Sequence, residues 1–321
     1  MTSFLHIGDV HLSDTPPGWR TDTYRQDVLD KLTAAIGIAN AREVDAVLIA
    51  GDLFHHRTRV AHALIADTID VLHGSRAPVH ILPGNHDLRE NRLETAPRQP
   101  IGLVARALNV PLATERFSVV GPDKDYVQVI PVPYIHGMTV AALSEYVTQR
   151  VVLNTPTVVW VHNSVTPTDD YPFPVLSTDS PDWNVPGELV IAGHIHDDLG
   201  LWQTSTGQKC LNFGALSRGS LTTAALDFKP SVALVSFDGP DALPTVEKIP
   251  VPHRPASEVF RVEERDAKVS TKEASEDFVA ALSDTSLPSS FTVDDLERRI
   301  HESDVEQPVR DAAVAAVQEV W

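Results

Sequence analysis

Histidine, aspartate and asparagine gather at five places in this sequence, each directly after a short apolar segment. The clearest group is Gly84-Asn85-His86-Asp87, which follows the apolar residues 79–82 and the breaker Pro83. Asparagine offers a neutral oxygen to a metal ion, histidine can carry a proton, and aspartate can orient a histidine through its ring N–H. The other four groups are Asp9-x-His11, Gly51-Asp52, His162 and Gly193-His194-x-His196.

Together these groups offer imidazole, carboxylate and amide donors without a thiolate, a set that suits Mn, Fe, Zn or a similar divalent ion. In an extended segment residues i and i+2 point the same way, so the Asp9/His11 and His194/His196 pairs could each face one metal pair. Each group alone also has a simpler explanation: a turn at Asp9, a helix cap at Asp52, or a core histidine at His162. Their joint occurrence in this order favours a metal site.

The segments that precede these groups predict an α/β fold. Strands are expected at 4–7, 46–50 and 79–82, and they alternate with two helices that carry apolar stripes. Ligands of open α/β sheets bind where the strands end, so we expect the polar groups at one rim. Further strands are expected at 117–120, 126–132, 157–161 and 189–192, with helices at 101–108 and 139–151. Strands at 199–203, 209–213 and 232–237 are expected to complete a second sheet.

Two regions lack this pattern. Residues 166–187 are rich in Pro and Asp without periodicity, which is typical of a functional or mobile loop. Beyond about residue 244 acidic residues increase, and helices are expected at 272–282 and from 293 onward. We therefore expect a main domain over 1–245 and a small appended domain over 246–321.

Composition limits the classes of function. The chain has 321 residues and a formal charge of -18, which is unusual for a protein that holds nucleic acid on a broad basic face. Bound divalent cations would offset part of this charge locally. No apolar run is long enough to span a membrane, and no signal peptide is evident. The single cysteine, Cys210, fits a core position and a reducing compartment, so a cytoplasmic location is expected.

The order D-x-H, G-D, G-N-H-D, H, G-H-x-H resembles the calcineurin-like metallophosphoesterase superfamily. The segments LHIGDVHL, GDLFHHR, ILPGNHD, GHIHDD and NFGALSRGS are most similar to its SbcD-type DNA repair nucleases. This resemblance implies a four-layer α/β/β/α metallophosphoesterase sandwich with a small C-terminal α+β capping domain. It also implies two divalent metal ions, most often Mn²⁺, with Mg²⁺, Fe²⁺ or Zn²⁺ as alternatives.

The resemblance also implies roles for individual residues. The metal ligands would be Asp9, His11 and His196 for one ion, Asn85, His162 and His194 for the other, and Asp52 as a bridge. His86 would act beside the scissile phosphate, and Asp87 would orient it. His55 and Arg57 would lie beside the substrate.

The expected function is that of a two-metal-dependent DNA exonuclease or endonuclease, an SbcD-like subunit in double-strand-break repair or recombination. The implied partners are DNA, an SbcC-type ATPase subunit and a second copy of the chain. The alternative is a small-molecule phosphodiesterase or phosphatase of the same superfamily, for which a charge of -18 is less unusual. A non-catalytic scaffold, as in retromer's phosphoesterase-like subunit, is disfavoured because all seven ligand positions and His86 are filled. The protein-phosphatase branch is disfavoured because its second and third motifs read GDxVDRG and GNHE, whereas this sequence has GDLFHH and GNHD.

Overall fold

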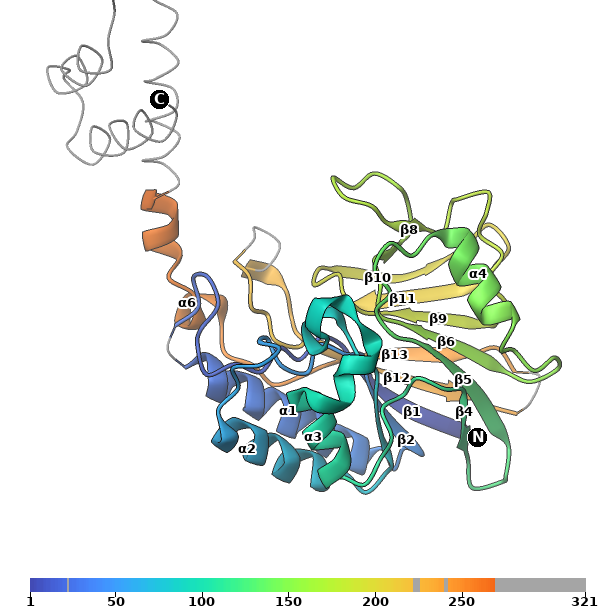
Figure 1. Ribbon diagram of the computed structural model, residues 1–321, viewed down its shortest axis with the longest axis horizontal. Helices are drawn as coiled ribbons and strands as arrows, with labels where there is room; N and C mark the ends of the chain where they lie inside the picture. Colours follow the sequence, from blue (N-terminus) through green and yellow to red (C-terminus); the bar gives the residue numbers. More distant parts are fainter. Residues whose placement is uncertain (22, 222–225, 240–241, 269–321) are drawn as a thin grey trace, which may run out of the picture. The chain divides into compact units, whose positions relative to one another are not determined.

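The computed structural model describes residues 1–21, 23–221, 226–239 and 242–268. The chain divides into two compact units, Met1–Val259 and Phe260–Trp321. The first unit holds two large sheets, and helices cover their outer faces (Figure 1). Within the described residues no helix is long and apolar enough to cross a bilayer.

The first sheet has the strand order β13-β12-β1-β2-β3. Its parallel part is built from strand–helix units that begin at the N-terminus, and the last two strands add antiparallel to β1. The strands are β1 (Thr2–Ile7), β2 (Ala46–Ile49), β3 (Val79–Ile81), β12 (Ser231–Phe237) and β13 (Thr245–Pro250). The covering helices are α1 (Tyr24–Ala41), α2 (His62–His73) and α3 (Pro100–Ala107).

The second sheet has the order β10-β11-β9-β6-β5-β4, with β5, β6, β9 and β11 parallel and an antiparallel strand at each edge. Its strands are β4 (Phe117–Val120), β5 (Tyr126–Val132), β6 (Thr157–Val161), β9 (Leu189–Ala192), β10 (Asp198–Gln203) and β11 (Lys209–Phe213). Helix α4 (Val140–Thr148) covers its outer face. A short pair, β7 (Val165–Thr166) with β8 (Leu176–Ser177), interrupts the expected loop at 166–187.

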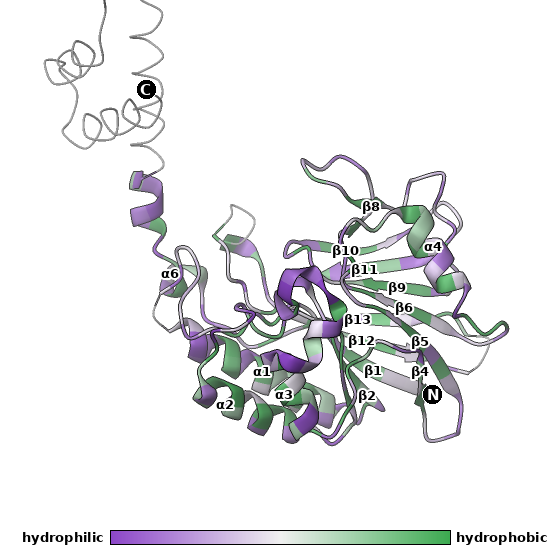
Figure 2. Cartoon of the chain, in the orientation of Figure 1, coloured by the Kyte–Doolittle hydropathy of each residue, from purple (hydrophilic) through white to green (hydrophobic). Residues whose placement is uncertain are grey.

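Three apolar cores separate four layers. One core lies between the first sheet and α1 to α3, and another packs α4 on the second sheet through Leu143 and Val147. The middle core lies between the sheets, where Phe4 and Leu48 meet Trp160. Figure 2 shows the hydrophobic colour concentrated in the strands and on parts of the covering helices. The expected α/β sandwich is therefore confirmed.

One assignment of a strand was wrong. Residues 232–237 were expected in the second sheet, but β12 pairs with β1 in the first. The apolar pattern of this buried strand is compatible with either sheet. Because strands that follow one another in sequence usually pair, the second sheet was predicted. Strand β13 was not predicted at all, because an edge strand with mostly exposed residues carries little apolar pattern.

The predicted boundary at residue 245 falls at the start of β13, and the first unit continues through α6 (Ala256–Val259). The helices expected at 272–282 and beyond lie outside the described residues. A capping domain over 246–321 thus stays a prediction. Cys210 is buried in β11, as expected of a core residue.

Candidate metal and active site

The five polar groups converge where strands of both sheets end. Asp9 and His11 follow β1, Asp52 follows β2, and Asn85 opens the short 3-10 helix η1 (Asn85–Asp87) after β3. From the second sheet, His162 follows β6, and His194 and His196 follow β9. Side chains almost two hundred positions apart in sequence therefore share one rim.

The first predicted ligand group is compact. One ligand atom each of Asp9, His11 and His196 lies within 4.8 Å of the others. The rings of His11 and His196 stand edge to face with centroids 4.6 Å apart. Asp9 and His11 are buried. These three side chains can hold one ion.

The second group is equally close, and Asp52 joins it to the first. Ligand atoms of Asp52, His162 and His194 lie within 4.8 Å of one another. Asn85 Oδ1 is 2.8 Å from His194 Nδ1 and 3.3 Å from His162 Nε2. Asp52 Oδ2 lies 3.4 Å from His162 Nε2 and 3.4 Å from His11 Nε2, the position expected of a bridging ligand. All seven predicted ligands thus meet, and their coordinating roles stay predictions.

Several of these residues have a left-handed backbone, which non-glycine residues rarely adopt. The φ angles are 25° at Asp9, 47° at His11, 46° at Asp52 and 78° at His194. Such strain costs free energy and persists only where surrounding contacts enforce it. Here the His11 N–H donates to the Asp52 carbonyl at 2.8 Å, and the His194 N–H donates to the Asp9 carboxylate at 3.0 Å.

The glycine before Asp52 is required by close approach. Gly51 has φ +90°, and a Cβ there would lie 2.7 Å from His162 Nδ1. A Cβ on Gly84 would overlap the Asp52 carboxylate. The G-D and G-N-H-D patterns therefore reflect how tightly the ligands of the two sheets pack.

Buried charges of opposite sign shift the titration of the ligands. Burial disfavours the imidazolium of His162, but the carboxylates of Asp52 and Asp9 outweigh it and raise the pKa of His162 to about 9. Burial also disfavours the charged Asp52, yet His162 and His11 hold the pKa of its carboxyl far below the usual range. Burial, with a smaller effect of His162, lowers the pKa of His194 to about 4.

The residues fit a pair of divalent ions. The donor set is mixed nitrogen and oxygen with no thiolate. His11 Nε2 is buried without a hydrogen-bond partner in the described part of the chain, although it faces Asp52 at 3.4 Å. A buried polar atom is rarely left in this state, and a metal ion would satisfy it.

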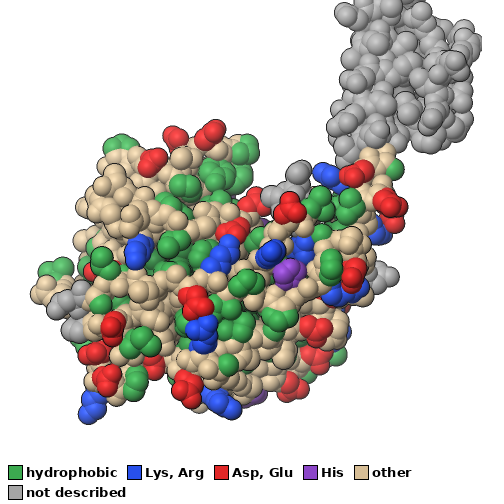
Figure 3. All heavy atoms as spheres, turned by 180° about the vertical axis from the view of Figure 1, so that it is seen from behind, with side chains coloured by type: hydrophobic (Ala, Val, Ile, Leu, Met, Phe, Trp, Pro, Cys, Tyr) green, Lys and Arg blue, Asp and Glu red, His purple; other side chains and the backbone are tan. Residues whose placement is uncertain are grey.

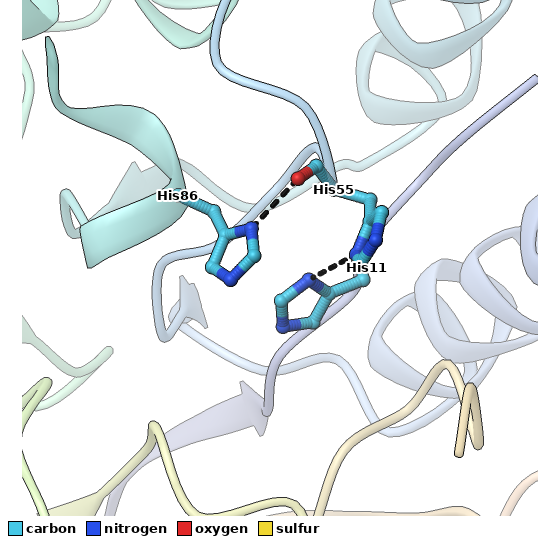
Figure 4. A group of neighbouring side chains, drawn as sticks. All are labelled: His11, His55 and His86. Carbon is cyan, nitrogen blue, oxygen red and sulfur yellow. Dashed lines mark hydrogen bonds between the residues drawn. The ribbon is translucent and has the colours of Figure 1, made fainter. Parts of the chain in front are cut away.

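His86 is held by the backbone of His55. Its Nδ1–H donates to the His55 carbonyl at 2.7 Å, and the two rings stack with centroids 5.3 Å apart (Figure 4). The ring of His86 also stands 4.8 Å from that of His11. His55 Nδ1 lies 3.4 Å from His11 Nδ1. His86 and His55 are thus both placed beside the ligands.

Asp87 makes a contact that the sequence did not predict. Its buried carboxyl accepts the Gly84 N–H at 2.9 Å, so it closes the turn rather than contacting the His86 ring. Burial and the neighbouring Asp52 raise the pKa of Asp87 to about 8. The orienting group for His86 is the backbone carbonyl of His55. Arg57 lies exposed in the loop after β2, and no contact joins it to these ligands in the described residues.

One positioning residue was missed from the sequence. The buried Asn212 donates from Nδ2 to the carbonyl of Ile195 at 3.0 Å and accepts the Gly214 N–H at 2.7 Å. The next amide, that of Ala215, donates to the His196 carbonyl at 3.0 Å. Asn212 therefore holds the His194-Ile195-His196 segment. The Asn-Phe-Gly sequence at a strand end was the available signal.

Three solved structures are similar to this chain over about the same length. A dimetal phosphatase from Danio rerio has 11% identity and a TM-score of 0.46, covering 78% of this chain and 99% of the other. A 5'-nucleotidase precursor from Thermus thermophilus has 14% identity and a TM-score of 0.45, covering 78% and 54%. A NAD nucleotidase from Haemophilus influenzae has 14% identity and a TM-score of 0.44, covering 78% and 50%.

A family model provides the assignment. The model of calcineurin-like phosphoesterases matches residues 2–198, which include all seven predicted ligand positions. Members of this family are dinuclear metal-dependent hydrolases of phosphoesters. The chain belongs to the calcineurin-like phosphoesterase family.

Proposed function

We propose that this chain hydrolyses phosphodiester bonds in DNA, as an Mn²⁺-dependent nuclease subunit of the SbcD type. Support comes from His86, whose Nδ1–H is fixed on the His55 carbonyl at 2.7 Å beside the ligand cluster. Both histidines belong to the segments GDLFHHR and ILPGNHD, on which the resemblance to these nucleases depends. DNA, an SbcC-type ATPase, a second copy of the chain and a cytoplasmic location belong to the same proposal.

The seven ligands would hold the two ions in two groups that share Asp52. When bound, the ions would neutralise charge on the phosphate and promote ionisation of the attacking water. Burial at this rim strengthens the electrostatic interactions of the protein groups with a phosphate. The strained backbone and its hydrogen bonds keep the ligands in place before any ion arrives.

His86 would supply the proton for the leaving group. With Nδ1 donating to the His55 carbonyl, Nε2 is the nitrogen that can hold and deliver a proton. A diester releases an alkoxide, which leaves faster when it is protonated in the transition state. His55 would reinforce this position from the side, because its ring stacks on that of His86.

The second candidate is a small-molecule phosphodiesterase or phosphatase, and the charge of the chain favours it. The formal charge is -18, and on the face shown in Figure 3 the basic side chains are interspersed with acidic ones. A broad basic surface would favour polynucleotides. A small ester needs only the local cations.

Incubation with Mn²⁺ and end-labelled linear DNA, beside bis-p-nitrophenyl phosphate, separates the two candidates. The proposal expects both to be cleaved by the wild type and neither by Asp52→Asn, which removes the shared ligand charge. Cleavage of the ester without any cleavage of single-stranded or duplex DNA would overturn the nuclease proposal and favour the second candidate.

A further inference from the structure

A cavity of about 670 Å³ opens directly beside the predicted metal ligands. Its inner end is formed by His194 and His196, and its walls come from the segments after β5 and β6 and from the loop before β8. This volume lies in the range of small-ligand sites. A group in this cavity would be attached to a phosphate held at the metal cluster.

The walls carry aromatic rings and few charged side chains. Tyr134, Met138 and Phe173 line the cavity, and Asp197 is the one carboxylate among the described lining residues, which include no lysine or arginine. Because no lysine or arginine of the described residues lines the cavity, it does not suit a second phosphate. It suits a flat, weakly polar group. Nucleobases stack on such side chains because every base has a π-face.

The Tyr134 wall is rigid. Its backbone N–H donates to the Pro83 carbonyl at 3.0 Å, and its ring lies 5.4 Å from that of His194. The next residue, Ile135, is held at both backbone groups by the amide of Asn163, at 3.1 and 3.4 Å. Tyr134 thus stands at a fixed place between the cavity and a metal ligand.

Phe173 supplies a second ring. Its side chain is 46% exposed, so part of its ring is accessible to a ligand in the cavity. The loop that carries it is anchored by the β7–β8 pair and by the Leu176 N–H, which donates to the Ser164 carbonyl at 2.7 Å. Tyr171 packs 5.6 Å from Phe173 but does not line the cavity.

From these observations we propose that the cavity beside His194 is a nucleobase subsite in which Tyr134 and Phe173 hold an unpaired base of the substrate. This inference rests on the proposed phosphodiesterase function and adds the place where a base of the substrate is held. It also explains how a chain with a charge of -18 can bind nucleotides, since stacking replaces ionic contacts to the backbone.

Calorimetric binding of adenosine 5'-monophosphate and ribose 5-phosphate to the Mn²⁺-loaded protein tests this subsite, because the two ligands share sugar and phosphate and differ by the base. We expect the nucleotide to bind roughly 10- to 100-fold more tightly in the wild type. Tyr134→Ala and Phe173→Ala should each reduce this ratio by about fivefold or more, and Tyr134→Phe should restore it. Released phosphate is measured in the same samples, so that turnover is not mistaken for binding.

Tyr171→Ala is the matched control, since it removes a neighbouring ring outside the cavity, and its ratio should equal that of the wild type. Equal affinity of the wild type for both ligands would overturn the subsite, as would a ratio that neither Tyr134→Ala nor Phe173→Ala changes. The exposed Phe173 keeps the test decisive if Tyr134→Ala fails to fold. The binding ratio does not depend on DNA cleavage, so failure of the nuclease proposal would be seen separately.

Discussion

His86 is the side chain whose chemistry can be isolated from metal binding. It contacts the backbone of His55 and lies near His11, but it belongs neither to the group Asp9, His11 and His196 nor to the group Asp52, His162 and His194. Replacing it should therefore remove a proton donor while the two ligand groups stay intact. His56 offers a control, because it is an exposed histidine in the same loop as His55.

We predict that His86→Ala lowers turnover of a phosphodiester by about 10²- to 10⁴-fold, the usual contribution of a general acid. The bound Mn²⁺ per chain, measured by atomic emission after dialysis, should equal that of the wild type, and His56→Ala should match the wild type in both measurements. Undiminished turnover in His86→Ala would remove this residue from the mechanism, and loss of metal would make it a ligand instead.

The pKa of His6 shows the effect of burying a histidine whose Nε2 has no hydrogen-bond partner in the described residues. This residue lies in β1 on the side of Phe4, facing the second sheet. Burial lowers the pKa of His6 from 6.5 to about 3. Between pH 6.5 and pH 3, His6 is therefore protonated in the unfolded chain but not in the folded chain. The free energy of unfolding falls as the pH drops through this range.

At pH 5 this difference amounts to about 2 kcal/mol, and above pH 6.5 it vanishes. We predict that His6→Leu loses about 2 kcal/mol less unfolding free energy than the wild type between pH 7 and pH 5, measured by urea denaturation. His73→Leu, at an exposed position, should follow the wild type. An identical pH slope for His6→Leu and the wild type would contradict the burial argument.

At the scale of the element, the ligands after β9 depend on the neighbouring strand β11. Asn212 at its end bonds the Ile195 carbonyl and the Gly214 N–H, and it is almost completely buried. A side chain near the end of β11 therefore positions the segment that follows β9. Metal affinity should be sensitive to a residue that touches no metal, as is found for outer-shell groups in general.

We predict that Asn212→Leu weakens Mn²⁺ binding by about 10- to 100-fold and lowers the unfolding free energy by about 1–3 kcal/mol per polar group left unpaired. Gln128→Leu is the control, because its buried amide bonds Val152 and Thr157 at the end of β6 opposite to His162. Both variants should lose stability, measured by denaturant titration, but Gln128→Leu should bind Mn²⁺ like the wild type. Equal metal affinity in both would leave Asn212 with a structural role only.

The sequence predicted the strands that carry the ligands. It did not predict all of the hydrogen bonds that position the site residues. Strands such as 157–161, which precedes His162, were predicted correctly. A strand that is buried on both faces has a continuous run of apolar residues in the sequence. The His55 carbonyl as the partner of His86 could not be found, since every residue carries a backbone carbonyl. Strand β12 was misplaced because pairing partners are set by the whole sheet, not by the strand itself.

At the scale of the whole molecule, charge and cavity together determine how salt acts on substrate binding. A protein that binds nucleic acid through six to ten phosphate contacts loses about 10³- to 10⁵-fold in affinity between 50 and 200 mM salt. This chain has a charge of -18, and no lysine or arginine lines the cavity beside His194 in the described residues. Repulsion between the chain and a polyanion is also screened by salt, which opposes the usual loss.

We therefore predict that the KM for a short single-stranded oligonucleotide, at fixed Mn²⁺, changes by less than about fivefold between 50 and 200 mM KCl, because few counterions are released. A neutral-backbone oligonucleotide with one cleavable phosphate should show the same shallow dependence, since stacking and the metal cluster would supply the binding. A loss of a hundredfold or more for the charged oligonucleotide alone would mean that ionic contacts to several phosphates hold the substrate, and stacking beside His194 would then be a minor contribution.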